Sequence, residues 1–281
     1  MLAGLVAEFL RELSACGASP HTVKSYRLAL GRLCSSLPSD PEAITVRHLQ
    51  AALAALGGSG STAAHRRSVV SSFFGWLERA GHISSNPALH LGAAKRPEGL
   101  PRPIPVDDLG RVLGAVRQLP LVPRTLFLLL ADTGLRVGEA LSLDVCDVVW
   151  DPGQEAVLVE HGKGGRARAV PLFPDMACFS PLRRLCRERR AGPLFVSARG
   201  SRMDYDTARY WWQRSLASAG VNGYTIHQLR HTAVSRWVRE GVNLAAVRRL
   251  AGHRSMQTTM RYAEVHDEMV RREMRRLWRR A

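Results

Sequence analysis

The 281-residue sequence contains few cysteines, few lysines and no long apolar run, and each shortage narrows what the chain can be. Its five cysteines include no Cys-x-x-Cys pair and are odd in number, which argues against a disulfide framework and a zinc site. No apolar run approaches the ~20 residues that span a bilayer. The apolar first segment lacks a basic leader and is interrupted by Glu8. We therefore expect a cytoplasmic protein without a membrane segment, a metal site or a cofactor.

Lysine is scarce among the basic residues. Of the 40 basic residues 37 are arginine, and the three lysines are Lys24, Lys95 and Lys163. A genome rich in G and C would produce this bias without any functional cause. Lysine, however, can release its proton at accessible pH, and arginine cannot. Lys163, the sole lysine after residue 95, is therefore a candidate for proton transfer.

The abundant feature of the chain is positive charge. The formal net charge is +16 and the isoelectric point is near 10.9. Such a chain favours polyanions, and nucleic acid is the commonest polyanion that a soluble protein meets. A ribosome-like or merely soluble basic protein would have the same composition. Charge alone thus indicates a class of partner but no activity.

Residues 1–95 are predicted to form a helical domain, because apolar residues recur every three or four positions. Residues 65–80 illustrate the pattern, with one apolar face and a basic start. Ser19-Pro20 is predicted to open an earlier helix, and the glycine-rich residues 57–61 to form a loop. Four prolines and a glycine then interrupt residues 96–105, where we place an interdomain linker.

Residues 106–281 are predicted to form a second domain of mixed composition. Helices are expected after residue 106 and over the apolar residues 123–130. The pattern then alternates over residues 155–160 and 166–172, which predicts a β-hairpin with Lys163 at its tip. Later residues return to a helical period. The expected fold is mainly α with a small antiparallel β-sheet, in two domains.

Three short motifs in the second domain carry candidate chemistry. They are Arg136 after a Thr-Gly-Leu turn, His227-Gln228-Leu229-Arg230-His231, and Gly252-His253-Arg254-Ser255 followed nine residues after His253 by Tyr262. In this order, with Lys163 on a hairpin between the first two, they resemble the tyrosine recombinase family, also called phage-integrase-like. The resemblance implies a helical core-binding domain followed by a mixed α+β catalytic domain. Within the family, the resemblance favours the Xer-like branch or the branch of transposon and plasmid recombinases.

The resemblance implies that the chain transfers DNA phosphoryl groups through a covalent tyrosine ester. Tyr262 would be the nucleophile, and its phenol is a better leaving group than an alkoxide when the DNA hydroxyl returns. Arg136 and Arg230 would clamp the phosphate oxygens, although a surface salt bridge is the ordinary role of either. His227 would accept the Tyr262 proton, and His253 would donate to the phosphate.

Two further residues have expected roles in this chemistry. Lys163 would protonate the leaving 5′ oxygen, although an exposed hairpin lysine without such a role fits the same pattern. Glu139 lies one helical turn after Arg136 and would orient a catalytic side chain. His231 and His161 are assigned ordinary structural roles.

The family likeness also implies an assembly on double-stranded DNA. Four protomers on two sites would exchange strands through a Holliday junction, as a homotetramer or together with a second recombinase. Residues 265–281 would dock on a neighbouring protomer, although their arginines could instead contact phosphates. Candidate DNA contacts in the first domain are Lys24, Arg27, Arg66 and Arg67.

Three other functions remain open on the sequence alone. A metal-dependent nuclease or transposase would need ligands from Asp132, Glu139, Asp144, Asp147 and Asp151, whose spacing suggests no clean site. A non-enzymatic DNA-binding protein on the same fold would bind DNA without the six candidate catalytic residues, which are Arg136, Lys163, His227, Arg230, His253 and Tyr262. A type IB topoisomerase would share the chemistry but act as a monomer on any supercoiled DNA.

Overall fold

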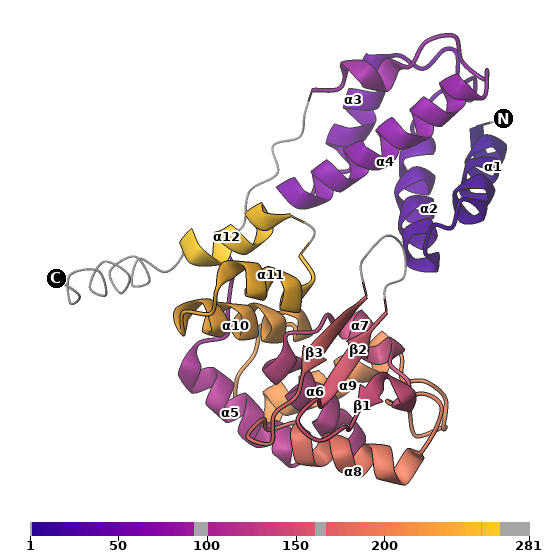
Figure 1. Cartoon of the computed structure of the whole chain (residues 1–281). Coiled ribbons are helices and arrows are strands. Elements are labelled where there is room, and N and C mark those ends of the chain that lie inside the picture. Colours follow the sequence, from indigo (N-terminus) through magenta and orange to yellow (C-terminus); the bar gives the residue numbers. More distant parts are fainter. Residues whose placement is uncertain (1, 93–100, 161–166, 254, 265–281) are drawn as a thin grey trace. The chain divides into compact units, whose positions relative to one another are not determined.

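A computed structural model describes residues 2–92, 101–160, 167–253 and 255–264 of the chain. The chain divides into two compact units, Met1–Gly99 and Leu100–Ala281, which are described separately. The described residues are mainly helical, with one three-stranded antiparallel sheet (Figure 1). This confirms the predicted fold class. Within the described ranges, no helix is long and apolar enough to cross a membrane.

The first unit is helical in its described part. Its elements are α1 (Leu2–Ala15), α2 (Pro20–Cys34), α3 (Val46–Ala55), α4 (Gly60–Arg79) and the short 3-10 helix η1 (Pro87–His90). Helix α2 begins where predicted, because the Ser19 side chain accepts a hydrogen bond from the Thr22 amide at 3.1 Å. The predicted loop at residues 57–61 is too long by two residues, since α4 already begins at Gly60.

The core of the first unit is built around three aromatic rings. Phe9 of α1 lies 5.4 Å from Phe73 and 5.6 Å from Trp76, both on α4 (ring centroids). The indole nitrogen of Trp76 donates to the Glu12 carboxylate at 2.6 Å, so its polar atom is satisfied. The apolar face predicted for residues 65–80 is buried, which confirms that this helix faces the core.

The second unit contains the sheet and most of the remaining helices. In chain order its elements are α5 (Val106–Arg117), α6 (Leu121–Thr133), α7 (Val137–Ser142), η2 (Val145–Asp147), β1 (Val148–Val149), β2 (Ala156–Val159), β3 (Arg168–Pro171), α8 (Phe179–Arg189), α9 (Tyr205–Ser218), α10 (Ile226–Arg239), α11 (Leu244–Ala251) and α12 (Met256–Glu264). Helix α6 is the central core helix, with buried side chains around its circumference.

The strands follow the predicted hairpin with one addition. β2 and β3 pair antiparallel, and Val159 faces Arg168 at the start of β3. β1 pairs with the other edge of β2 and was not predicted, because two residues are too short to show an alternating pattern. Residues 161–166, which include Lys163 and His161, lie outside the described residues.

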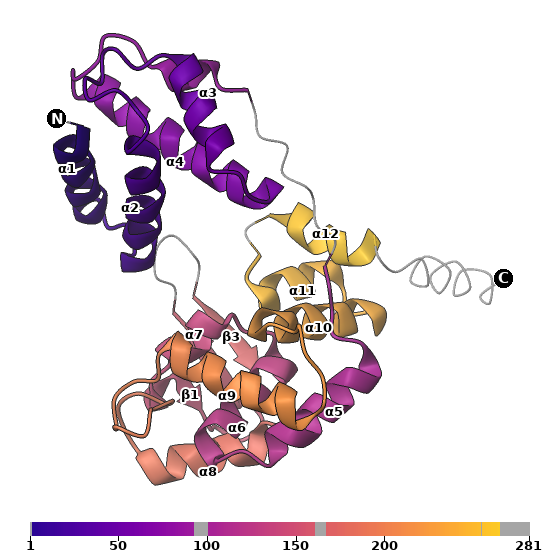
Figure 2. The same cartoon turned by 180° about the vertical axis from the view of Figure 1, so that it is seen from behind.

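Helices α10, α11 and α12 pack on one another next to the main core (Figures 1 and 2). They share a small apolar cluster of their own, formed by Val234, Val238, Val247, Ala251 and Tyr262. The turn after α6 approaches this group closely. A Cβ on Gly134, which has a φ of 60°, would lie 3.1 Å from the Trp237 ring. Gly134 therefore allows α10 to approach the end of α6.

Candidate active site

Tyr262 lies on α12, where its ring is packed against neighbouring side chains and its hydroxyl is hydrogen-bonded. Its side chain belongs to the apolar cluster of the last three helices, and the residue is 4% exposed. The hydroxyl is 2.7 Å from Nδ1 of His231. The ring stacks on that of His253, with centroids 5.9 Å apart and planes 16° from parallel. Burial raises the pKa of the Tyr262 hydroxyl, while the charges of Arg230 and Arg136 act in the opposite direction.

Three arginines converge on the carboxyl end of α11. Arg168 donates to the Leu250 carbonyl at 2.9 Å, Arg230 to Ala251 at 2.6 Å, and Arg136 to Gly252 at 3.1 Å. The last carbonyls of a helix lack intrahelical partners and carry the negative end of the helix dipole. The end of α11 therefore gathers guanidinium groups from three separate elements, namely β3, α10 and the start of α7.

The glycine that ends α11 makes this convergence possible. Gly252 has a φ of 64°, a left-handed conformation that terminates the helix. A Cβ at this position would lie 2.9 Å from Nη1 and 3.0 Å from Cζ of Arg168. Glycine thus satisfies both the backbone turn and the close approach of the guanidinium.

Glu139 joins two of the three arginines. Its carboxylate accepts from Nη1 of Arg136 at 2.8 Å and from Nη2 of Arg168 at 2.8 Å. It also accepts from the Arg136 amide at 2.8 Å, which caps the start of α7. Burial raises the Glu139 pKa, but the hydrogen bonds from Arg168 and the Arg136 amide outweigh it and lower the pKa to about 2. Glu139 is therefore ionised at neutral pH.

The two arginines predicted to clamp phosphate differ in exposure. Arg230 is 3% exposed, and its second Nη donates to the Gly134 carbonyl at 2.8 Å. Burial, followed by the charge of Arg136, lowers the Arg230 pKa to about 10. The Arg136 side chain is 42% exposed. Within the described part of the site, Arg136, Arg168 and Arg230 bring three positive charges beside the Glu139 carboxylate, an excess that suits an incoming anion.

Three imidazoles lie around Tyr262 and the arginines. Burial lowers the pKa of His227, His231 and His253, and the neighbouring Arg230 adds to the effect on each. The pKa values of His231 and His253 fall to about 4. Nδ1 of His253 is 2.9 Å from the Thr259 hydroxyl, which fixes its ring beside Tyr262. His231 and His253 are therefore neutral at pH 7.

The structure assigns different neighbours to the histidines than the sequence prediction did. The Tyr262 hydroxyl hydrogen-bonds to His231, which was expected to be structural. His227, the predicted proton acceptor, lies edge-on to His231 with ring centroids 4.7 Å apart. Both histidines lie on the same face of α10, at positions four residues apart, and the packing of α12 brings the hydroxyl to the second.

Sequence reasoning also missed Arg168. It is one arginine among 37, and no motif marks it. The available signal was its place as the third residue of the predicted strand 166–172, where a charged residue that becomes buried needs a partner. In the structure, its side chain is 5% exposed and contacts Glu139.

The remaining candidates are distributed as follows. Lys163 lies outside the described residues, as do residues 265–281. Lys24 and Arg27 are exposed on α2. Arg66 and Arg67 are half-buried on α4, and each donates to backbone carbonyls of its own unit. In the described ranges, no group of three or more His, Cys, Asp or Glu side chains could hold a metal ion.

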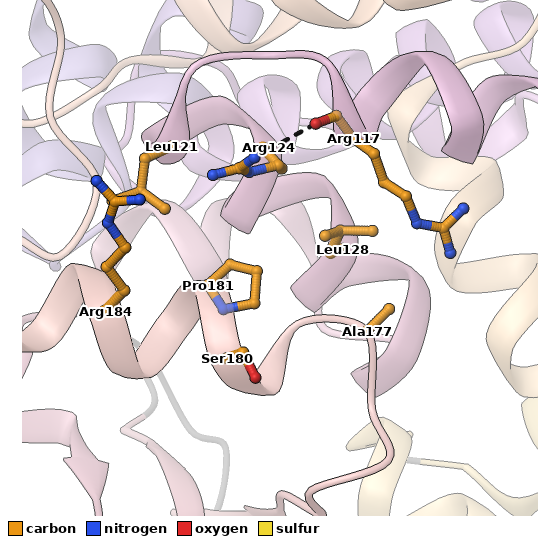
Figure 3. Close-up of a pocket in the computed structure, with 8 residues that line it drawn as sticks. All are labelled: Arg117, Leu121, Arg124, Leu128, Ala177, Ser180, Pro181 and Arg184. Carbon is orange, nitrogen blue, oxygen red and sulfur yellow. Dashed lines mark hydrogen bonds between the residues drawn. The ribbon is translucent and has the colours of Figure 1, made fainter.

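A separate pocket lies between α8 and the α5–α6 pair (Figure 3). The pocket is lined by the apolar side chains of Leu121 and Leu128 together with Arg117, Arg124 and Arg184. Arg124 donates to the Arg117 carbonyl at 3.3 Å. None of the candidate catalytic residues lines this pocket, so it is distinct from the site around Tyr262.

Comparison with family models and curated proteins gives consistent matches along the chain. The model of the phage integrase family matches residues 104–269, and that of the phage integrase N-terminal SAM-like domain matches residues 6–81. The chain is 36% identical to tyrosine recombinase XerC of Rhodospirillum centenum over 275 residues, covering 90% of this chain and 80% of that protein. It is 33% identical to XerC of Mycobacterium tuberculosis over 270 residues, covering 89% and 90%.

Solved structures share the fold. A lambda integrase fragment in a dimer bound to a COC′ core site superposes with a TM-score of 0.74 at 22% identity, covering 92% of this chain and 96% of that chain. The XerH site-specific recombinase bound to palindromic difH substrate gives a TM-score of 0.73 at 21% identity, covering 93% and 81%.

Proposed function

Because the chain belongs to the phage integrase family of tyrosine recombinases, we propose that Tyr262 is the nucleophile with which it cleaves and rejoins DNA. The chain is an Xer-like site-specific recombinase, and such strand exchange proceeds through a Holliday junction. One observation carries the assignment of Tyr262. Its hydroxyl is hydrogen-bonded to a neutral imidazole, on a helix that packs against α10 and α11, and the arginines gather at the end of α11.

The arginine cluster supports the proposed handling of phosphate. A phosphodiester is an anion whose nonbridging oxygens gain charge in the pentavalent transition state. Arg136 and Arg230 each donate to a backbone carbonyl in the structure, and each guanidinium has five N–H donors. Arg136 also donates to Glu139 and Arg230 to Gly134, and we assign the N–H groups outside these contacts to the phosphate. His253 uses Nδ1 towards Thr259, which leaves Nε2 for a phosphate oxygen.

The proposed reaction conserves the energy of the phosphodiester bond. The Tyr262 oxygen attacks phosphorus, a 3′-phosphotyrosine ester forms, and the 5′ oxygen of the DNA leaves with a proton. We assign the donation of that proton to Lys163, whose ammonium can release it. A DNA 5′ hydroxyl then reverses the steps and restores the tyrosine. The proposed reaction uses no metal ion and consumes no nucleotide cofactor.

His227 receives a different role from that expected for it from the sequence. Its ring is next to His231 rather than at the Tyr262 hydroxyl. Burial, followed by the charges of Arg230 and Arg136, lowers its pKa. This position supports a hydrogen bond from His227 to the phosphate or to the leaving oxygen. Glu139 would hold Arg136 in place through its two hydrogen bonds.

We propose double-stranded DNA as the partner and a tetramer on two sites as the assembly. The net charge of +16 supports binding to phosphates. One of the structures with the same fold is a lambda integrase tetramer bound to a Holliday junction. The tetramer would consist of this chain alone or include a second recombinase, with residues 265–281 docking between protomers. The five free cysteines support a reducing cytoplasm.

Trapping the covalent adduct tests the assignment. The protein selects its site from random-sequence duplexes, and the selected duplex is then nicked next to the scissile phosphate. We expect a 3′-phosphotyrosyl adduct on a denaturing gel, in the presence of EDTA, for the wild type and for Tyr205→Phe, a control at an exposed tyrosine. Tyr262→Phe should abolish the adduct and retain DNA binding. An adduct formed by Tyr262→Phe would disprove the proposal.

A further inference from the structure

We infer that His231 is a catalytic residue that positions the Tyr262 hydroxyl and takes up its proton during DNA cleavage. The inference rests on the proposed function of Tyr262 as the nucleophile. It assigns a role to a histidine that lies next to the clamping arginine in sequence and was expected to be structural.

The geometry of the contact fits proton transfer. Nδ1 of His231 and the Tyr262 oxygen are 2.7 Å apart, within the range for a general base and the group it deprotonates. Both partners are held in place by their surroundings. The neighbouring Arg230 fixes α10 through bonds to the Gly134 and Ala251 carbonyls, and Tyr262 is packed in the apolar cluster of α10 and α11.

The other two imidazoles are placed for different tasks. His253 stacks its ring on that of Tyr262 and uses Nδ1 towards Thr259. His227 contacts the edge of His231. Among the described residues, His231 is the one whose ring nitrogen hydrogen-bonds to the hydroxyl. It is therefore the best placed of the three to take the proton.

Both partners of the hydrogen bond are uncharged at neutral pH. Burial, followed by the charges of His227 and Arg230, lowers the His231 pKa to about 4. Burial raises the pKa of Tyr262. At neutral pH both groups are therefore uncharged. The inference places the imidazole proton on Nε2, so that the phenol donates to an unprotonated Nδ1. A neutral imidazole is the form that can act as a base.

The charged groups near His231 favour transfer of the Tyr262 proton to Nδ1. Arg230 and Arg136 favour the phenolate form of Tyr262, and His227 and His253 are the other titratable groups near the ring. The O–H bond of Tyr262 breaks and the proton bonds to Nδ1, while the phenolate oxygen bonds to phosphorus. The bond from phosphorus to the 5′ oxygen breaks, and that oxygen takes its own proton from the separate acid. Religation reverses both transfers.

Two substitutions separate positioning from proton uptake. In His231→Asn an amide atom takes roughly the place of Nδ1, so the hydrogen bond can form but a proton cannot be accepted. His231→Ala removes both functions. We expect adduct formation on the selected nicked duplex to slow by about 100-fold or more in His231→Asn, and further in His231→Ala. His90→Asn, at an exposed histidine of the first unit, is the matched control and should react like wild type.

The dependence on pH distinguishes a base from a structural residue. Without a base, cleavage depends on the small fraction of the protein in which Tyr262 is already ionised at the pH of the assay. The rate of His231→Asn should therefore rise about tenfold for each pH unit below the Tyr262 pKa, while the wild type varies little above the His231 pKa. A deficit that stays constant from pH 6 to 9 would indicate a structural role and overturn the inference.

A substrate with sulfur in place of the 5′ oxygen identifies which proton is involved. A thiolate leaves without an acid, so a defect in leaving-group protonation disappears on this substrate. The deficit of His231→Asn should persist, because the attacking phenol still needs a base. Recovery to the wild-type rate would assign His231 to the leaving group instead. Cleavage by His231→Asn faster than wild type would mean that His231 restrains Tyr262, which also contradicts the inference.

Nitrogen NMR of the intact protein tests the contact without DNA. At pH 7 the ¹⁵N spectrum should show His231 neutral, with the proton on Nε2 and with Nδ1 shifted by Tyr262→Phe. A protonated Nδ1 would overturn the inference. If Tyr262→Phe abolishes the adduct but His231→Asn reacts at the wild-type rate, His231 has no such role and the function of Tyr262 stands. An adduct formed by Tyr262→Phe would instead refute the function itself.

Discussion

Substituting Glu139 by glutamine should destabilise the second unit strongly, because it removes a charged partner of the buried Arg168. The Arg168 side chain is 5% exposed and that of Glu139 is 12% exposed, so water screens their contact little. Removing one partner of a buried ion pair costs about 3–5 kcal/mol. The Glu139 pKa gives a similar value, since a fall from 4.5 to about 2 corresponds to roughly 3 kcal/mol of stability at neutral pH.

The pH dependence of this effect has a definite sign. Because the pKa of Glu139 is depressed in the folded state, its contribution is fully present above about pH 4.5 and is lost as the pH falls towards 2. The difference in unfolding free energy between wild type and Glu139→Gln should therefore be constant from pH 5 to 8. It should shrink below pH 4.5.

Thermal unfolding measures the effect. A loss of about 3 kcal/mol should lower the Tm of a unit of this size by about 6–12 °C. The control is Glu188→Gln, which removes an ion pair with Arg184 whose side chains are 50% and 67% exposed. Exposed pairs contribute about 0–1 kcal/mol, so the control should change Tm by no more than about 4 °C. Equal shifts for the two variants would refute the reasoning.

Gly252→Ala should destabilise the protein by about 1–3 kcal/mol, measured by urea denaturation, and should slow adduct formation. The reason is that residue 252 has a φ of 64° and that the new Cβ would lie 2.9 Å from Arg168. Wild-type stability and rate would contradict this. Arg136→Lys should slow cleavage by about 100-fold, since a compact ammonium cannot span Gly252, Glu139 and a phosphate as the guanidinium fork can. The Tm should stay unchanged, because the Arg136 side chain is 42% exposed, and a near wild-type rate would contradict the prediction. Iodoacetamide at pH 8 should label the exposed Cys16 and Cys146 first, as judged by mass spectrometry. Burial raises the pKa of the Cys34 thiol to about 11, so this residue should react slowly. Rapid labelling of Cys34 would contradict the described packing.

The helices and their ends were largely predictable because their signals are local. Ser19-Pro20 marks the start of α2, and Gly134 marks the end of α6. The alternating residues on both sides of Lys163 indicated β2 and β3. β1 escaped prediction because it is only two residues long and exists through its pairing with β2. Its position depends on a partner strand rather than on its own sequence.

The spacing of the motifs on their helices was also readable from the sequence. His227, Arg230 and His231 lie at positions i, i+3 and i+4, which places all three on one face of α10 whatever the surroundings. That spacing cannot say which histidine meets the nucleophile, since both point towards the same side. The choice depends on where α12 rests against α10. The packing of Tyr262 against Val234 and Val247 sets that position.

The sequence by itself determined the family, the two-part helical architecture and the chemical types of the candidate residues, because these depend on composition, period and motif order. Only the tertiary structure decided that Arg168 joins Arg136 and Arg230, and that His231 holds the hydroxyl of Tyr262. Arg168 and Glu139 are 29 residues apart, and the end of α11 lies a further 82 residues along the chain from Arg168. Such contacts arise when β3, α7 and α11 pack around a shared set of backbone carbonyls, and no local pattern records that arrangement.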